Sequence, residues 1–177
     1  MRTYKLHLIR HGMTEGNLSG QYIGLTDLPI TTNGIIELKK LKSDGIYPKC
    51  DMVFSSPLVR ATETAGIIYP EKEILINHNF KEIDFGDFEG KTPLELKDNP
   101  DYAKWVEGDL PSAPNGESTL EFATRLCTGI NEVVRRMMSE EVYSAAIVMH
   151  GGAIMTLLSV AALPRMKMAE GACGNGR

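Results

Sequence analysis

Residues 145–163, AAIVMHGGAIMTLLSVAAL, give the clearest indication of the fold. They form a run of 19 residues without Lys, Arg, Asp or Glu, close to the length of a membrane-spanning helix. A histidine and paired glycines at the centre of the run are unfavourable in hydrocarbon. We therefore predict a buried strand over 145–149, a turn over 150–152, and an apolar helix over 153–163 that ends before Pro164.

The rest of the chain shows the same alternation of short apolar runs with longer helical patterns. Further strands are predicted over 4–9, 51–54 and 74–76. One helix is predicted over 32–43, and three more are predicted to begin at Ser56-Pro57, Thr92 and Ser118. The helix that begins at Ser118 is the longest, because its apolar residues repeat every three to four positions from Leu120 to Met137. This alternation predicts an α/β fold, a three-layer α/β/α sandwich with a mostly parallel central sheet, in a single domain over 1–177.

Composition limits the classes of partner and compartment. With 42% hydrophobic residues, 24% charged residues and a net charge of −4, the chain has enough apolar side chains for a core and no general attraction to nucleic acid or anionic membranes. Cys50, Cys127 and Cys173 are widely spaced, which favours reduced thiols. The N-terminal apolar stretch is interrupted by His7 and is too short for a signal peptide, so we expect a cytoplasmic protein.

Polar residues that directly follow the predicted strands are the candidates for chemistry, because ligands of such sheets bind beyond the carboxyl ends of strands. Arg10-His11-Gly12 follows the first strand, a segment ending in Arg60 follows the second, and His150-Gly151 follows the last. Two arginines, two histidines and backbone donors suit a phosphate dianion. A neutral imidazole is the strong nucleophile of this set, so we assign His11 as nucleophile and His150 as an oxyanion partner.

Two other interpretations use the same residues. A metal hydrolase could gather His7, His11 and His150, but no spaced histidine pair lies on a helical pattern and the neighbouring arginines would repel a dication. An acyl hydrolase could use residues 12–16, which resemble G-x-S-x-G with threonine in the nucleophile position, but the HGG segment then follows the nucleophile instead of preceding it. His7 lies within its strand and is interpreted as structural.

Several longer blocks of sequence resemble the histidine phosphatase superfamily, also called phosphoglycerate-mutase-like. The blocks follow the family order and cover most of the chain: LIRHGMTEGN (8–17), GLTDLPITTNG (24–34), SSPLVRATETA (55–65), FKEIDFGDFEG (80–90), GES (116–118) and IVMHGGAI (147–154). The resemblance implies the phosphoglycerate-mutase-like fold and a phosphatase that needs neither metal nor cofactor.

The resemblance also implies roles for individual residues. His11 would be phosphorylated, Arg10, Arg60 and His150 would hold the phosphoryl group, and Glu82 would donate the proton to the leaving group. Composition alone does not select Glu82 from the neighbouring acids Asp84, Asp87 and Glu89; Glu89 and Glu15 are second choices. Carried over as phosphate-binding or substrate-binding positions are Asn17, Gly24, Gly151, Glu15 and Trp105.

Residues 82–116 are predicted to cover the pocket and contact the rest of the substrate. They include three lysines, nine acidic residues and no arginine, whereas mutase relatives carry a longer, more basic insertion here, so hydrolysis is favoured over transfer. Phe85, Phe88, Tyr102 and Trp105 could contact an uncharged or aromatic leaving group, or could anchor the segment to the core. The layout most resembles α-ribazole-5′-phosphate phosphatases and broad-specificity phosphatases.

The expected partner is therefore a small-molecule phosphate ester. A phosphoglycerate mutase, a protein phosphohistidine phosphatase and a non-catalytic phosphate-binding module remain alternatives, and the sequence leaves the oligomeric state open, a homodimer included. Family members continue past the last helix into another strand, whereas this sequence stops at Gly176-Arg177, so either the edge strand is absent or the sequence is abbreviated, and the completeness of the substrate pocket stays open. Residues 169–177 are predicted to lack fixed structure.

Overall fold

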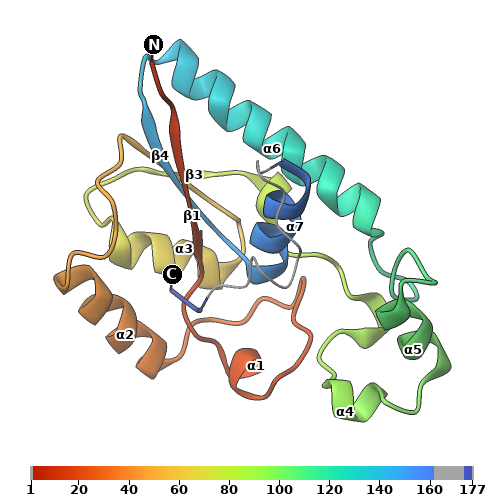
Figure 1. Ribbon diagram of the computed structural model, residues 1–177. Helices are drawn as coiled ribbons and strands as arrows, with labels where there is room; N and C mark the ends of the chain where they lie inside the picture. Colours follow the sequence, from red (N-terminus) through yellow and green to blue (C-terminus); the bar gives the residue numbers. More distant parts are fainter. Residues whose placement is uncertain (1, 162–173, 177) are drawn as a thin grey trace.

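A four-stranded parallel sheet forms the centre of the computed structural model, which describes residues 2–161 and 174–176 (Figure 1). The strands lie in the order β1-β4-β2-β3 and span Lys5–Arg10 (β1), Met52–Ser55 (β2), Ile74–Ile76 (β3) and Ser144–Met149 (β4). Strand β4 lies between β1 and β2 and pairs in parallel with both. The four predicted strands are confirmed to within one residue at each end.

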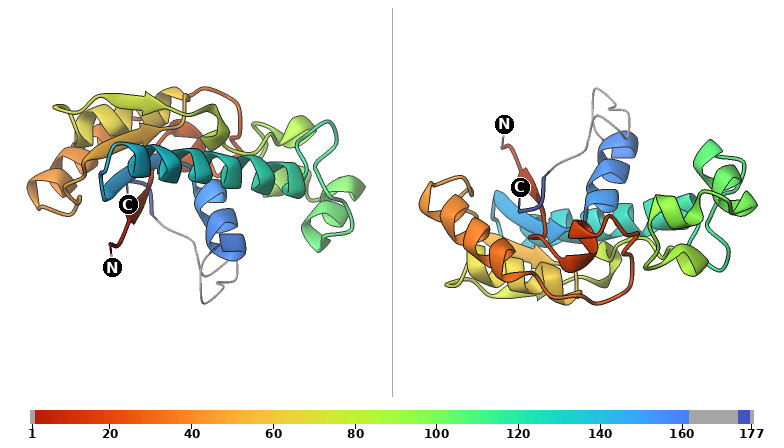
Figure 2. Two further views of the ribbon diagram at one scale, coloured as in Figure 1. Left: turned by 90° about the horizontal axis from the view of Figure 1, so that it is seen from above. Right: turned by 90° about the horizontal axis from the view of Figure 1, so that it is seen from below.

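Helices cover both faces of the sheet (Figure 2). Helices α2 (Thr32–Ser43) and α3 (Val59–Ile68) lie on one face, and α6 (Thr119–Ser139) and α7 (Gly151–Ala161) lie on the other. Alternate residues of β4 enter different cores: Ile147 packs in the cluster under α6 and α7, and Val148 packs in the cluster under α2 and α3. The predicted three-layer α/β/α sandwich is therefore confirmed.

The apolar run over 145–163 forms two elements, β4 and α7, as predicted. Among the described residues, no helix combines the length and the apolar character needed to cross a bilayer. The predicted turn over 150–152 is wrong, because helix α7 begins at Gly151 and the His150 carbonyl already accepts a bond from the Ile154 N–H at 3.0 Å. Residues 162 and 163 of the predicted helix lie outside the described residues.

The start predicted for the helix after β2 is also wrong. Helix α3 begins at Val59, and Ser56 does not cap it. The Ser56 hydroxyl instead pairs with His150 Nε2 at 2.8 Å, while the Val59 N–H donates to Asp27 Oδ1 at 2.7 Å. A carboxylate distant in the sequence thus accepts from the first N–H of the helix. The serine hydroxyl accepts from the Leu58 N–H at 3.4 Å, outside the helix, and bonds to His150 in the site.

Capping boxes at Thr92 and Ser118 are confirmed, and they open α4 (Pro93–Leu96) and α6. The interpretation of Leu120 as a core residue is wrong: it is 77% exposed, and Phe122, 2% exposed, is the first residue of α6 that enters the core. The buried face continues through Leu126, Val133 and Met137. The predicted apolar stripe of α6 is therefore confirmed at Leu126, Val133 and Met137 and differs only in the first turn, where Phe122 replaces Leu120.

The segment after β3 stands beside the sheet at the far end of α6 (Figure 1). It contains two 3-10 turns, η1 (His78–Phe80) and η2 (Gly86–Phe88), and the short helices α4 and α5 (Pro100–Glu107). Its small core is formed by Phe88, Leu96 and Ala113, with four aromatic rings packed around them: Tyr22, Phe85, Tyr102 and Trp105. The anchoring interpretation holds for Phe88, which is fully buried.

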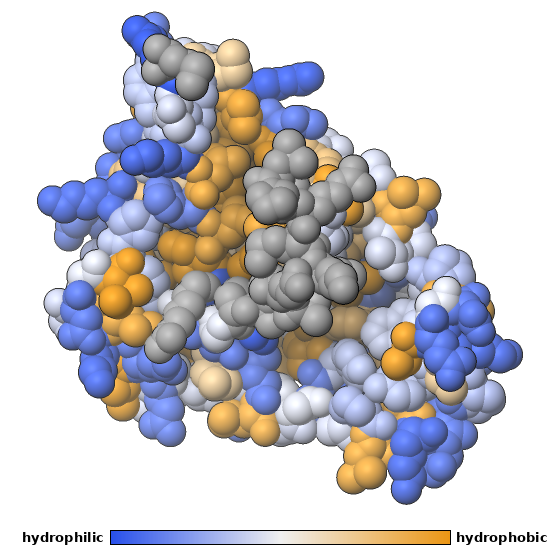
Figure 3. Space-filling model, viewed as in Figure 1, coloured by the Kyte–Doolittle hydropathy of each residue, from blue (hydrophilic) through white to orange (hydrophobic). Residues whose placement is uncertain are grey.

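Strand β1 lies at one end of the strand order, and apolar side chains are visible over it and β4 (Figure 3). Of the predicted flexible tail 169–177, the structure describes only 174–176, where the Gly176 N–H approaches the carbonyls of Arg10 and His11, each at 3.0 Å. The other tail residues, and Cys173, lie outside the described part of the chain. Cys50 and Cys127 are free thiols.

Candidate active site

The carboxyl ends of β1, β2 and β4 bring the candidate residues together. His11 follows β1 and its N–H donates to the Met149 carbonyl at 2.9 Å, while the Ser56 N–H after β2 donates to the Val148 carbonyl at 2.9 Å. His150 follows β4 directly, so the His11 and His150 rings lie with centroids 5.2 Å apart. Parallel pairing therefore joins segments that are far apart in the sequence at one edge of the sheet.

His11 is held as a neutral imidazole. Its Nδ1 lies 2.7 Å from the Gly12 carbonyl oxygen, which accepts only if Nδ1 carries the proton, so Nε2 keeps its lone pair. Burial lowers the pKa of His11 to about 3, with Arg60 and Arg10 adding to the shift against the opposing Gly12 bond. An unprotonated nitrogen nucleophile is thus available across the ordinary pH range.

Arg60 lies behind this ring, almost fully buried. Its Nη1 and Nη2 donate to the carbonyls of Thr26 (2.8 Å) and Gly24 (2.7 Å), and its Nε donates to His150 Nδ1 at 3.2 Å. A His150 ring that accepts at Nδ1 must carry its proton at Nε2, which donates to Ser56 Oγ. Burial, followed by the charge of Arg60, lowers the pKa of His150 well below its ordinary value.

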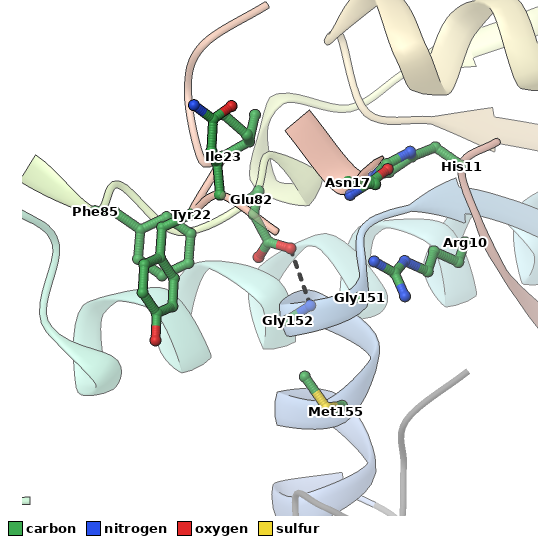
Figure 4. Close-up of a pocket in the computed structure, with 11 residues that line it drawn as sticks. Arg10, His11, Asn17, Tyr22, Ile23, Glu82, Phe85, Gly151, Gly152 and Met155 are labelled. Carbon is green, nitrogen blue, oxygen red and sulfur yellow. Dashed lines mark hydrogen bonds between the residues drawn. The ribbon is translucent and has the colours of Figure 1, made fainter. Parts of the chain in front are cut away.

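Glu82 is the carboxyl group that faces His11 and Arg10 (Figure 4). Its Oε2 accepts from the Gly152 N–H at the start of α7 (2.9 Å), and its Oε1 accepts from the Ile83 N–H (3.0 Å). Burial raises the pKa of Glu82, against these two bonds and the charges of both arginines. A buried carboxyl group whose pKa is raised is suited to donate a proton.

A pocket of about 180 Å³ collects these groups. Figure 4 shows the Glu82 carboxylate between Tyr22 and Phe85 on one side and His11 and Arg10 on the other. Arg10 packs against the start of α7, where a side chain on Gly151 would place its Cβ 3.2 Å from the guanidinium carbon. The glycine therefore allows the Arg10 guanidinium to approach the N-terminus of α7. The cation and the helix N-terminus both favour a bound anion at this place.

Asn17 also lines this pocket, and the structure orients its amide. The Asn17 Oδ1 accepts from the Thr14 N–H (3.1 Å), the Thr14 hydroxyl (3.0 Å) and the Asn175 amide (2.9 Å). Because the oxygen is occupied in this way, the Nδ2 group is the end that can donate to an anion in the pocket.

The predicted residues are not all brought to the pocket wall. Its lining includes the predicted residues Arg10, His11, Asn17, Glu82 and Gly151. Arg60 and His150 are placed behind His11. The second-choice acids are directed elsewhere: Glu15 is exposed and Glu89 Oε1 accepts from the N–H groups of Gly24 and Thr26.

Gly24 and Trp105 support the pocket without lining it. The Gly24 carbonyl holds Arg60, and a Cβ on Gly24 would lie 2.0 Å from the Ile83 carbonyl oxygen, so the two loops cross in contact here. Trp105 packs edge-on against Tyr22 and Phe85, with ring centroids 5.5 and 6.1 Å apart. It backs the aromatic wall of the pocket.

Sequence reasoning missed the side chains that form the rest of the wall: Gln21, Tyr22, Ile23 and Met155. Residues 21–23 belong to no block with a chemical signature, so no local signal marked them. Met155 had one available signal, since it lies one helical turn beyond Gly151 and therefore on the same side of α7.

The donor set around the pocket does not suit a metal ion. Among the described residues, no group of three or more His, Cys, Asp or Glu side chains could hold one. His7, which the metal interpretation required, lies within β1, four residues before His11, with its Nε2 3.4 Å from Ser144 Oγ. The two cations beside His11 would further oppose a dication.

Comparison with known proteins places the chain in a family. The profile of the histidine phosphatase superfamily (branch 1) matches residues 6–176. This chain belongs to that superfamily. Members of the histidine phosphatase superfamily are phosphatases and mutases, and the chain is accordingly an enzyme of this kind.

Individual members of the superfamily are similar over most of the chain. A protein named uncharacterized phosphatase PhoE from Bacillus subtilis is 36% identical, over 86% of this chain and 74% of its own length. A 2,3-bisphosphoglycerate-dependent phosphoglycerate mutase from Methylobacterium radiotolerans is 31% identical, over 88% of this chain and 77% of its own. The crystal structure of the α-ribazole phosphatase from Shigella flexneri superimposes with a TM-score of 0.78 at 28% identity, covering 97% and 86% of the two chains.

Proposed function

We propose that this chain is a phosphomonoesterase that hydrolyses small-molecule phosphate esters through a phosphohistidine at His11, without a metal ion. The observation that supports this most is the opposition of His11 and Glu82 across one pocket. The nucleophile is neutral and the facing carboxyl group has a raised pKa, which is the protonation pattern needed for attack and for leaving-group departure.

The reaction follows from this arrangement in two steps. In the first, His11 Nε2 forms a bond to phosphorus as the ester P–O bond breaks, and protonated Glu82 gives its proton to the departing oxygen. In the second, the Glu82 carboxylate takes a proton from water, which attacks phosphorus and breaks the P–N bond to release inorganic phosphate. Arg10 and the start of α7 stabilise the charge on the phosphoryl oxygens, with Arg60 and His150 behind them.

The pocket wall supports hydrolysis of an ester with an uncharged leaving group over phosphoglycerate mutation. Among the residues that the structure describes, Arg10 is the one cation in the lining, and the wall beyond Glu82 is formed by Gln21, Tyr22, Ile23, Phe85 and Met155. A phosphoglycerate carries a carboxylate in addition to its phosphate, and the described part of the pocket lining offers no second cation for that group. Neutral and aromatic side chains instead suit a neutral aromatic leaving group, as in α-ribazole 5′-phosphate.

A non-catalytic phosphate-binding module is disfavoured, because binding an anion needs neither a lone pair at His11 nor a protonated carboxyl group beside it. A protein phosphohistidine phosphatase is disfavoured, because a pocket of about 180 Å³ with Tyr22 and Phe85 in its wall suits a small ligand better than the surface of a protein. Phosphoglycerate mutase activity is the alternative that a relative's name favours. The test must therefore separate transfer of the phosphoryl group to a second substrate from release of inorganic phosphate.

The test is a rapid-quench experiment with a ³²P-labelled phosphomonoester. We expect acid-labile, base-stable label on His11 in the wild type and none in His11→Ala. His7→Ala, within β1 and outside the pocket lining, is the matched control that retains label. A panel of esters that includes α-ribazole 5′-phosphate and 3-phosphoglycerate, with 2,3-bisphosphoglycerate as donor, should release phosphate without forming 2-phosphoglycerate. Label on another residue, or transfer faster than release, would refute the proposal.

A further inference from the structure

Arg125, on α6, holds the turn that carries Glu82. Its Nη1 donates to the carbonyls of Asn79 and Lys81, both at 2.8 Å, and its Nη2 donates to the carbonyl of Glu82 itself at 2.9 Å. Three carbonyls within four consecutive residues are therefore fixed by one guanidinium group. The guanidinium group also lies over the Phe122 ring, with its Cζ 4.7 Å from the ring centroid, and this contact helps to fix its position above α6.

Glu117 completes this arrangement from the other side of Glu82. Its carboxylate accepts from Arg125 Nε (2.6 Å) and Nη2 (2.7 Å), a bidentate pair, and its own N–H donates to the Asp84 carbonyl at 3.0 Å. A Cβ on the preceding Gly116 would lie 2.6 Å from the same Asp84 oxygen, so the loop segments around Asp84 and Gly116 are in direct backbone contact. The backbone is thus fixed before and after Glu82.

Arg125 is not a ligand for the substrate. A guanidinium has five N–H donors, and the five bonds to Asn79, Lys81, Glu82 and the two Glu117 oxygens use all of them. The side chain is also absent from the lining of the catalytic pocket. Whatever it contributes to catalysis must pass through the segment that it holds.

We propose that the Arg125–Glu117 pair is the positioning device for the proton donor. It fixes the backbone on both sides of Glu82, so that the short side chain reaches the leaving group and the Gly152 N–H at once. This inference rests on the proposed role of Glu82. A lysine at position 125 has three donors on one atom and cannot span three carbonyls and a carboxylate, so Arg125→Lys keeps the charge but releases the turn.

The test uses leaving groups of different basicity. A proton donor matters for a basic alkoxide and hardly at all for a weakly basic nitrophenolate, so loss of general acid catalysis steepens the dependence of kcat/KM on leaving-group pKa. We expect Arg125→Lys to lose about 10- to 100-fold on alkyl phosphates and less than about threefold on 2,4-dinitrophenyl phosphate. If Arg125 had a merely structural role, the substitution would lower the fraction of active protein, and kcat/KM would fall by the same factor for both kinds of ester.

Matched variants complete the experiment. Arg136→Lys changes an arginine on the same helix that pairs with Glu140 at 2.8 Å on the surface, and it should behave as wild type. Glu82→Gln should show the steepened dependence, and Arg125→Lys added to it should cause no further loss on alkyl phosphates. If Glu82→Gln lowers kcat/KM by the same factor for all esters, the proposed role of Glu82 is wrong. If Glu82→Gln steepens the dependence but Arg125→Lys does not, or if their losses multiply, the positioning role is wrong.

A second variant, Glu117→Gln, tests the inference in case Arg125→Lys does not fold. Glu117→Gln retains Arg125 and its bonds to the three carbonyls but weakens the bidentate pair, so we expect the same selective loss, smaller in size, with an unchanged circular dichroism spectrum. An equal loss on alkyl and dinitrophenyl esters in this folded variant would overturn the inference.

Discussion

Substitution of Gly152 by alanine should displace the Glu82 carboxyl group while leaving the fold intact. A Cβ built on Gly152 lies 2.6 Å from Glu82 Oε1 and 3.1 Å from Cδ. To reach an ordinary contact of 3.4 Å, the carboxyl oxygen must retreat by about 0.8 Å, away from the Gly152 N–H that now holds Oε2. The pocket in front of Glu82 leaves room for this movement.

The size of the effect follows from that displacement. A misplacement of about 1 Å can cost roughly 10²-fold in rate, and complete loss of a general acid costs about 10²- to 10⁴-fold. We therefore expect kcat/KM of Gly152→Ala for alkyl phosphates to fall about 100-fold. Alanine is the better helix former by about 1 kcal/mol, so the melting temperature should not fall by more than a few degrees.

Gly66→Ala is the matched control, because Gly66 lies in helix α3 with no atom within 4 Å of a built Cβ. Both variants would be assayed by phosphate release from alkyl and dinitrophenyl esters, with thermal unfolding followed by circular dichroism. Wild-type kcat/KM on alkyl esters in Gly152→Ala would show that the carboxyl group does not act from its observed place. An equal loss in Gly66→Ala would point to a helix effect instead.

Further predictions concern stability, metals and packing. Because burial raises the pKa of Glu82 above 4.5, the folded protein keeps this proton to a higher pH than the unfolded protein does, so its contribution to stability is lost as pH rises. Urea titrations should show Glu82→Gln gaining stability relative to wild type as the pH rises above 4.5. His11 has the opposite sign: its pKa falls from 6.5 to about 3, so wild type should lose stability as pH falls through this range, and His11→Asn should lose less. Excess chelator should leave turnover unchanged, since the cations beside His11 oppose a dication; loss of turnover that zinc restores would contradict this. Phe88→Ala, at a fully buried ring, should lower the unfolding free energy by about 3–5 kcal/mol, whereas a loss below about 1 kcal/mol would show that the aromatic cluster does not fold with the core.

Much of the frame was predictable because its signals are local. The apolar run before His150 and the capping boxes at Thr92 and Ser118 act within a few residues, and each formed the predicted element. The strand ends also placed His11 and His150 together, because parallel strands meet at one edge of the sheet. Residue types that follow a buried strand therefore indicated the nucleophile before any contact was known.

Which acidic residue faces His11 was decided by tertiary structure. Glu82 and Glu89 lie in the same acidic segment, but folding buries Glu82 against the start of α7, where Gly152 lies 70 residues further along the chain, and this burial raises its pKa against the opposing Gly152 bond. Arg125, like the acids, bears a surface-type side chain in the sequence, yet folding directs all five of its donors inward. Local pattern fixes which elements form, whereas desolvation and hydrogen bonding depend on partners brought in from elsewhere, and these determine the chemistry of each ionisable group.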